Sequence, residues 1–141
     1  METCPEFFGS ITMLYVDVKV NGNPVQAFVD SGAQSTIISK KCAEDCNIMH
    51  LLDTRFAGMA VGVGTSRILG RVHLADMEIG GHKLQCSFTV LEDNKVDLLF
   101  GLDNLKRHQC CIDLVDSRLH LRKGEFYVDF LGEGQIKKNA F

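Results

Sequence analysis

A single acidic residue, placed where an apolar strand gives way to a tight loop, constrains this chain more than any other feature of its sequence. The run Ala27-Phe28-Val29 is apolar and is followed directly by Asp30-Ser31-Gly32. An apolar run of this kind is typical of a buried strand, which would deliver the carboxylate of Asp30 to a loop. Gly32 then permits a backbone course that a residue with a Cβ atom would resist.

The triplet Asp30-Ser31-Gly32 is open to two interpretations. Aspartate, serine and glycine all form turns, so it could be an ordinary turn. Average composition gives such a triplet by chance in roughly one chain of this length in twenty, so further features must decide. The functional interpretation is half of an aspartic-protease site, in which two carboxylates share one proton. Because the chain has one such triplet, the working unit would be a homodimer with Asp30 from each copy facing across a two-fold axis.

Three further features favour the functional interpretation. An apolar strand leads directly into the triplet, and a second apolar element, Leu98-Leu99-Phe100-Gly101, follows much later in the chain. Between them, the segment 55–72 is predicted to form a long hairpin with a thin, flexible tip at Val61-Gly62-Val63-Gly64-Thr65. This is the order of retroviral-type aspartic proteases: a loop with the aspartate, a mobile flap, and a strand of two hydrophobic residues and glycine that passes the loop and enters a helix.

Several blocks of the sequence extend this match beyond the class. In order and at the expected separations, they resemble the retroviral-protease-like domain of the DNA-damage-inducible ubiquitin-shuttle proteins, over about Met13 to Leu121. The blocks are Gln26-Ala27-Phe28-Val29-Asp30-Ser31-Gly32-Ala33-Gln34, Val61-Gly62-Val63-Gly64-Thr65, Leu69-Gly70-Arg71-Val72-His73, Cys86-Ser87-Phe88-Thr89-Val90-Leu91 and Gly101-Leu102-Asp103-Asn104-Leu105-Lys106-Arg107-His108.

The resemblance implies an all-β, retropepsin-like fold: a closed, barrel-like monomer with a flap hairpin and one or two short helices, assembled as a homodimer. It implies an aspartic endopeptidase in which Asp30 activates a water and Ser31, Gly32 and Ala33 support the catalytic loop. The tip 61–65 would close over an extended peptide or protein substrate. Family members are multidomain proteins, so ubiquitinated clients, the proteasome and a cytoplasmic location, with the nucleus as a second one, are implied by the resemblance alone.

A hypothesis from a different class stays open beside the enzyme. The domain could be a dimerisation and peptide-binding module of a ubiquitin shuttle, with little or no proteolytic turnover. The intact Asp30-Ser31-Gly32 favours the enzyme, because a pseudo-enzyme would be free to lose Asp30.

Composition narrows the remaining classes. The net charge of −3 gives no electrostatic case for nucleic acid, and no stretch approaches a membrane span. The N-terminus shows no signal peptide, so the six cysteines are expected to be reduced thiols, mostly buried as small hydrophobic residues. Neither a cofactor nor a metal is expected. Cys42, Cys46 and His50 have helical spacing that invites a metal site, but no fourth ligand has typical zinc spacing.

Local patterns predict the remaining elements. Residues 13–20, which alternate over their second half, are predicted to form a half-buried strand. Asn21-Gly22 is a hairpin turn, and 72–79, 84–91 and 96–100 are further strands. Ser39 should cap a helix from Lys40 to about Cys46 that ends at Asn47. A second helix is predicted over 102–108, and a last hairpin over 111–121. The predicted organisation is an N-terminal extension at 1–12, the protease-like domain at 13–123 and a partly ordered tail at 124–141.

Four polar residues inside these elements receive structural interpretations. His73 and His108 are expected to be partly buried packing residues, because an aspartic mechanism needs no histidine. Asp103 is interpreted as a cap of the second helix. Asp97, inside an apolar strand, is expected to be exposed at an edge.

Overall fold

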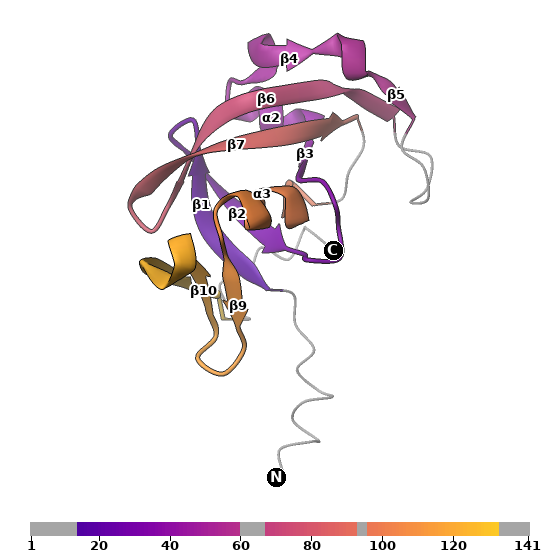
Figure 1. The fold of residues 1–141 in the computed structure, drawn as a ribbon. Helices are drawn as coiled ribbons and strands as arrows, with labels where there is room; N and C mark the ends of the chain where they lie inside the picture. Colours follow the sequence, from indigo (N-terminus) through magenta and orange to yellow (C-terminus); the bar gives the residue numbers. More distant parts are fainter. Residues whose placement is uncertain (1–13, 60–66, 93–95, 133–141) are drawn as a thin grey trace.

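A computed structural model describes residues 14–59, 67–92 and 96–132, and Figure 1 shows their course. The strands are β1 Tyr15–Val20, β2 Asn23–Val29, β3 Ile37–Ser39, β4 Leu52–Asp53, β5 Gly58–Met59, β6 Arg67–Ile79, β7 His82–Leu91, β8 Leu98–Phe100, β9 Cys111–Asp113, β10 Arg118–Leu121 and β11 Phe126–Asp129. The helices are α2 Lys40–Asp45 and α3 Leu102–Arg107, with single 3-10 turns η1 Met49–Leu51, η2 Thr54–Phe56 and η3 Arg122–Gly124. Over these described ranges, no helix has both the length and the apolar character needed to cross a membrane.

Six strands close into a barrel. Their hydrogen-bonded order is β1-β2-β8-β3-β7-β6, and β6 pairs again with β1 through Lys19↔Glu78 and Val20↔Met77. The strand β8 lies parallel to β2 and antiparallel to β3, and β3 lies parallel to β7. Closing the barrel pairs edges that an open sheet would expose. The fold is therefore mostly β, with α2 and α3 as the two short helices that the sequence predicted (Figure 1).

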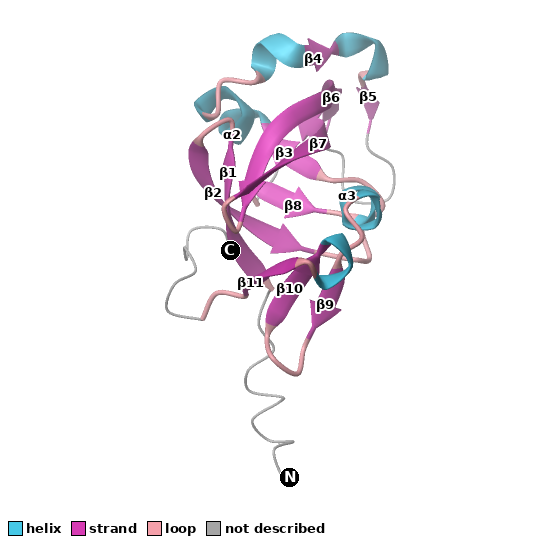
Figure 2. Ribbon diagram, turned by 60° about the vertical axis from the view of Figure 1, so that its left-hand side comes forward, coloured by secondary structure: helices cyan, strands magenta, loops and turns pink. Residues whose placement is uncertain are grey.

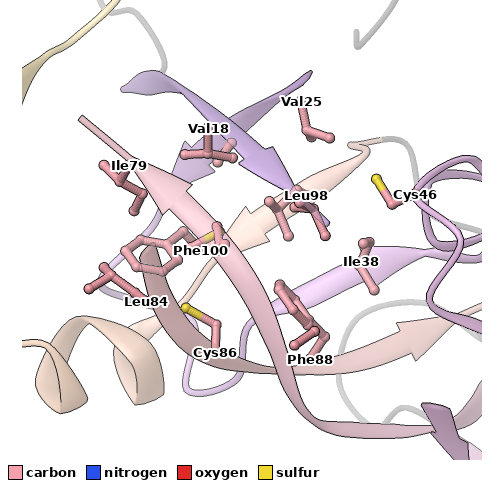
Figure 3. Close-up of a cluster of buried hydrophobic side chains, with 14 of the residues drawn as sticks. Val18, Val25, Ile38, Cys46, Ile79, Leu84, Cys86, Phe88, Leu98 and Phe100 are labelled. Carbon is pink, nitrogen blue, oxygen red and sulfur yellow. The ribbon is translucent and has the colours of Figure 1, made fainter. Parts of the chain in front are cut away.

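Alternating side chains fill the barrel. In β1, Val16, Val18 and Val20 are buried while Asp17 and Lys19 are exposed, as the period of two requires. The turn that follows has positive φ at Asn21 (51°) and Gly22 (83°), which suits a two-residue hairpin. Figure 3 shows the centre of the core, where side chains from β1, β2, β3, β6, β7, β8 and the end of α2 meet: Val18, Val25, Ile38, Cys46, Ile79, Leu84, Cys86, Phe88, Leu98 and Phe100.

The helix α2 follows its sequence signals closely. The side chain of Ser39 accepts a hydrogen bond from Cys42 N at 3.0 Å, which confirms it as the N-cap. Asn47 has φ 61°, so it ends the helix in the left-handed conformation, as predicted. The turn η1, which contains His50, therefore starts a new direction and does not continue the helical face of Cys42 and Cys46.

A second, three-stranded sheet with the order β11-β10-β9 lies at the end of the molecule opposite β4 (Figure 2). Its strand β11 was not predicted, since the sequence analysis assigned those residues to a partly ordered tail. It pairs with β10 and packs on the β6–β7 turn: a Cβ atom built on Gly80 would lie 2.9 Å from Val128 Cγ1. His82 also stacks on Phe126, with ring centroids 3.8 Å apart.

Several local predictions need correction. The strand predicted over 96–100 begins only at Leu98, with Asp97 exposed before it as expected. Three cysteines are buried as predicted (Cys42, Cys46 and Cys86), whereas Cys110 is half-buried and Cys111 is exposed.

Candidate active site

The loop that begins at Asp30 is anchored by strand pairing on its entry side. The strand β2 ends at Val29, whose register partner in the parallel neighbour β8 is Phe100. The next N–H, that of Asp30, donates to Phe100 O at 3.0 Å. Parallel pairing therefore continues up to the carboxylate-bearing residue, which fixes where Asp30 leaves the barrel.

The loop itself is organised around the carboxylate of Asp30. Gly32 N donates to Asp30 Oδ1 at 2.9 Å, and Ala33 N donates to Asp30 O at 3.2 Å. A Cβ atom on Gly32 would lie 3.2 Å from the same Oδ1, so a side chain there would crowd the carboxylate. Asp30 is half-buried and Ser31 and Gly32 are exposed in the single chain. One carboxylate oxygen is thus held by the backbone while the loop stays accessible.

The segment that links β8 to α3 clamps the far side of the loop. Leu102 N donates to Ala33 O at 2.7 Å and Asp103 N donates to Gln34 O at 3.1 Å. A Cβ atom on Gly101 would come within 2.5 Å of Ser35 O and 3.0 Å of Ala33 O. Because φ of Gly101 is −95°, a value open to any residue, glycine is required there for space and not for its backbone angle.

Beneath the loop lies a polar network that the sequence analysis missed. The hydroxyl of Thr36 donates to Asp103 Oδ1 at 2.7 Å and accepts from Gly101 N at 3.0 Å and from Asn104 Nδ2 at 2.7 Å. Asn104 continues to Ser87 on β7, donating to its O at 2.9 Å and accepting from its N at 3.3 Å. Thr36 and Asn104 are fully buried. The network ties the loop, α3 and β7 into one unit.

This network corrects the prediction for Asp103. The N-cap position of α3 is Gly101, and no side chain caps it. Asp103 instead accepts from Thr36 N at 3.0 Å and from the Thr36 hydroxyl, and from Asn104 N at 2.6 Å. The carboxylate belongs to the attachment between helix and loop. The Asp103-Asn104 pair, which begins two residues after Gly101, was the available sequence signal.

The hairpin expected to carry a flap has its arms in β5 and β6. They pair through Gly58↔Ile68 and Met59↔Arg67. The tip assigned to substrate binding, residues 61–65, lies outside the described residues. Behind the arms, Gly70 allows close packing of β4 on β6, since a Cβ atom there would lie 2.6 Å from Asp53 O.

An ion cluster of Asp53, Arg55 and His73 lies where β4 packs on β6, next to the hairpin. Asp53 accepts from Arg55 Nε at 3.0 Å and Nη2 at 2.7 Å, and its Oδ2 lies 2.8 Å from His73 Nε2. The hydrogen bonds from Arg55, and then from His73, hold the pKa of Asp53 well below its usual range. The prediction that His73 is partly buried was wrong, because its side chain is 51% exposed.

The other predicted polar and thiol groups lie apart from the Asp30 loop. His108 Nε2 lies 3.0 Å from Gln85 O and 3.6 Å from Cys86 Sγ, and burial lowers the pKa of His108. Burial also raises the pKa of Cys86 to about 12, so this thiol stays protonated. Across residues 14–59, 67–92 and 96–132, no group of three or more histidine, cysteine, aspartate or glutamate side chains could hold a metal ion.

Known proteins resemble this chain in sequence. Residues 5–113 match the aspartyl protease family. The chain is 62% identical over 140 residues to DNA damage-inducible protein 1 of Cryptococcus neoformans, covering 99% of this chain and 32% of that protein. It is 57% identical over 136 residues to human Protein DDI1 homolog 1, covering 96% of this chain and 34% of the homolog. The chain thus spans about a third of the length of these curated relatives.

Solved structures extend the comparison to the fold. The retroviral protease-like domain of Ddi1 from Leishmania major superposes with a TM-score of 0.83 and 45% identity, covering 90% of this chain and all of that one. The EIAV protease, solved with the inhibitor HBY-793, has a TM-score of 0.55 at 14% identity, covering 74% of this chain and 96% of that one, and so shares the fold alone. The chain belongs to the aspartyl protease family, as a retropepsin-like, retroviral protease-like domain of the DDI1 group.

Proposed function

We propose that this domain is an aspartic endopeptidase that works as a homodimer, with one Asp30 contributed by each chain. The observation that supports this most directly is the state of Asp30 in the single chain. Its carboxylate is oriented by Gly32 N at 2.9 Å, on a loop that β8 and α3 hold from both sides, and it remains only half-buried. Hydrogen bonds hold the backbone of the Asp30 loop, while the carboxylate itself stays accessible to a second chain.

The chemistry follows from bringing two such carboxylates together. Two carboxylates about 3 Å apart cannot both ionise, as in aspartic proteases generally, so the pair holds one proton and titrates as a unit. The ionised member takes a proton from a bound water, and the water oxygen attacks the scissile carbonyl carbon. The protonated member donates a hydrogen bond to the developing oxyanion. The C–N bond then breaks as the amine nitrogen takes up a proton from the pair of carboxyl groups. The pair is then left with one shared proton again.

The substrate is proposed to be an extended segment of protein. The arms of the β5–β6 hairpin and the Asp30 loop are both built of backbone that could pair with a peptide strand, which is recognition by strand addition. Ubiquitinated or proteasome-directed proteins of the cytoplasm and nucleus are the proposed clients. That part of the proposal is supported by the resemblance to the DNA damage-inducible relatives.

Cleavage of a diverse peptide library by the domain and by Asp30→Asn tests the enzyme, from mildly acidic to neutral pH. The expected result is cleavage by the unmodified domain alone, with both proteins equally folded and equally dimeric by analytical ultracentrifugation. Undiminished cleavage by Asp30→Asn would remove the assignment. Binding of peptides by both proteins with cleavage by neither would favour the peptide-binding module.

A separate measurement addresses the dimer. Each chain supplies one carboxylate. The specific activity should therefore rise as the protein concentration increases from below to above the dimer dissociation constant, which sedimentation measures. Mixing in excess Asp30→Asn protein should depress activity by forming mixed dimers. Full activity of a monomeric species would contradict a site shared between chains.

A further inference from the structure

Arg71 is a half-buried cation whose partners are neutral. It lies on β6, in register with Thr89 on β7. Its Nη2 donates to Ser87 Oγ at 3.1 Å and its Nη1 to Thr89 Oγ1 at 3.4 Å. Within the described part of the chain, no carboxylate lies within ion-pair distance of this guanidinium. Buried charges are normally paired, so this arrangement calls for an anion.

The acid that the sheet places opposite Arg71 is already engaged. Asp53 on β4 is its register partner, but both carboxylate oxygens of Asp53 are occupied by Arg55, and Oδ2 also lies 2.8 Å from His73 Nε2. Asp103, where α3 is attached to the Asp30 loop, accepts from Thr36 and Asn104. Among the described residues, no carboxylate therefore neutralises the positive charge of Arg71.

Arg71 lies in the part of the sheet next to the hairpin, where we propose that the peptide binds. On β7, Phe88 and Val90 are fully buried in the barrel, so the alternating Ser87 and Thr89 lie on the opposite face, where Ser87 is itself buried and Thr89 is half-buried. Arg71 lies across that face, three residues after Ile68, which pairs with Gly58 at the base of the hairpin.

The strand β7 also contacts the end of the Asp30 loop. Thr89 N donates to Thr36 O at 2.8 Å, and Thr36 ends the loop. Asn104 of α3 covers Ser87 from that side through two hydrogen bonds. Arg71 thus lies in the sheet between β4 and the base of the hairpin on one side and, on the other, β7, which contacts the end of the Asp30 loop.

We propose that Arg71 recognises an acidic side chain of the peptide substrate and makes this a specificity-determining residue of the protease. The proposal rests on the proposed function only in placing the peptide between hairpin and loop. A guanidinium has five N–H donors in a planar fork, of which Ser87 and Thr89 use two, so three remain for a carboxylate. Such a fork matches a carboxylate with two parallel hydrogen bonds, which a neutral amide cannot reproduce.

The test uses octapeptide libraries in which one position at a time is fixed as Glu or as Gln, at about pH 6, where a glutamate side chain is ionised. At one position, kcat/KM of the unmodified domain should be about tenfold higher for Glu than for Gln, the size expected for a charge-assisted hydrogen bond. Arg71→Gln should cleave the Glu and Gln libraries with the same kcat/KM, because its kcat/KM falls for the Glu library and is unchanged for the Gln library. Arg71→Lys should keep part of the preference, and added salt should weaken it.

A matched control separates net charge from position. Arg107→Gln removes one positive charge from an exposed position near the end of α3 and should leave the Glu preference intact. A preference lost equally in both variants would overturn the proposal in favour of a general charge effect. An equal loss by Arg71→Gln on both libraries would also overturn it, because Arg71 would then only join β6 to β7.

Binding to Asp30→Asn distinguishes failure of this inference from failure of the enzyme assignment. Fluorescence polarisation with the same labelled libraries needs no turnover. Tighter binding of the Glu library by Asp30→Asn, lost in Asp30→Asn combined with Arg71→Gln, supports the site even if the domain cleaves nothing. Equal binding of the Glu and Gln libraries, or no binding of either, would overturn the assignment of Arg71 whatever the cleavage assay shows.

Discussion

The hydroxyl of Thr36 donates a 2.7 Å hydrogen bond to the carboxylate of Asp103, which joins the end of the Asp30 loop to the first turn of α3. The same hydroxyl accepts from Gly101 N and Asn104 Nδ2, so three polar groups depend on one side chain. No single strand or helix could hold the loop in this way. The Asp30 loop is instead fixed by a buried polar contact between segments distant in the sequence.

Replacing Thr36 by valine should therefore cost more stability than its small change in shape suggests. The substitution keeps the volume but leaves Asn104 Nδ2, Gly101 N and Asp103 without their shared partner in a fully buried place. We expect a loss of about 2–4 kcal/mol in the free energy of unfolding, because Gly101 N–H and one hydrogen of Asn104 Nδ2 lose their acceptor, whereas Asp103 still accepts from Thr36 N and Asn104 N. Urea denaturation measures it, with Thr54→Val at an exposed position as the matched control. A loss as small as that of the control would contradict the role of the network.

Replacing Gly101 by alanine should displace the Asp30 loop. The added Cβ would lie 2.5 Å from Ser35 O, which is backbone and cannot rotate away. We expect destabilisation of about 1–3 kcal/mol from overpacking, together with a drop in kcat on any cleaved peptide. Gly81→Ala is the control: its φ of 84° makes alanine strained, but no atom lies within 4 Å. That variant should lose stability while kcat is retained, and equal kcat in both variants would contradict the steric argument.

The stability of the domain should fall as the pH drops below about 6.5, in part through His108. Burial lowers the pKa of His108 in the folded state, so the unfolded chain binds a proton first. Its contribution is complete above the unfolded pKa and is lost as the pH falls through the interval between the two pKa values. His108→Gln should flatten the dependence of the urea midpoint on pH between about 7.5 and 5. His50→Gln, at an exposed position, controls for the chemical change. An unchanged slope in His108→Gln would refute the assignment.

At more acidic pH, protonation of Asp53 should be the main cause of the loss of stability where β4 packs on β6. Arg55 and His73 hold its folded pKa below the ordinary value, so its contribution is present above about pH 4 and disappears as the pH falls further. Asp53→Asn should be less stable than the unmodified domain at pH 6, and the difference should shrink toward pH 2. Thermal unfolding across this range measures it, with Asp17→Asn on the exposed face of β1 as the comparison. A difference independent of pH would argue against the ion cluster.

Much of the architecture could be predicted because its signals are local. The alternation in β1, the Asn21-Gly22 turn and the Ser39 cap each act over a few residues, and each formed as expected. The strand β11 was missed for the opposite reason. Its pairing with β10 and its packing on Gly80 are long-range contacts that no pattern within Phe126–Asp129 specifies.

The same distinction applies to the site. The Asp30 triplet and the Gly101 element were recognisable as short motifs. The partners of Thr36 were not, because an isolated threonine, asparagine or aspartate in a sequence does not reveal which distant residue it will meet in the core. Arg71 stands in the sequence only as part of a block that resembles the family, and that it has no carboxylate partner among the described residues depends on the register of β4, β6 and β7.

The parallel pairing of β2 with β8 also sets when the site can exist during synthesis. Asp30 leaves the ribosome long before Phe100 and Gly101, the residues that anchor its loop. At the usual speed of translation that interval is on the order of several seconds, during which the nascent chain carries the aspartate without its supports. A half-made copy of this domain would therefore carry Asp30 on a loop that its later anchors do not yet hold.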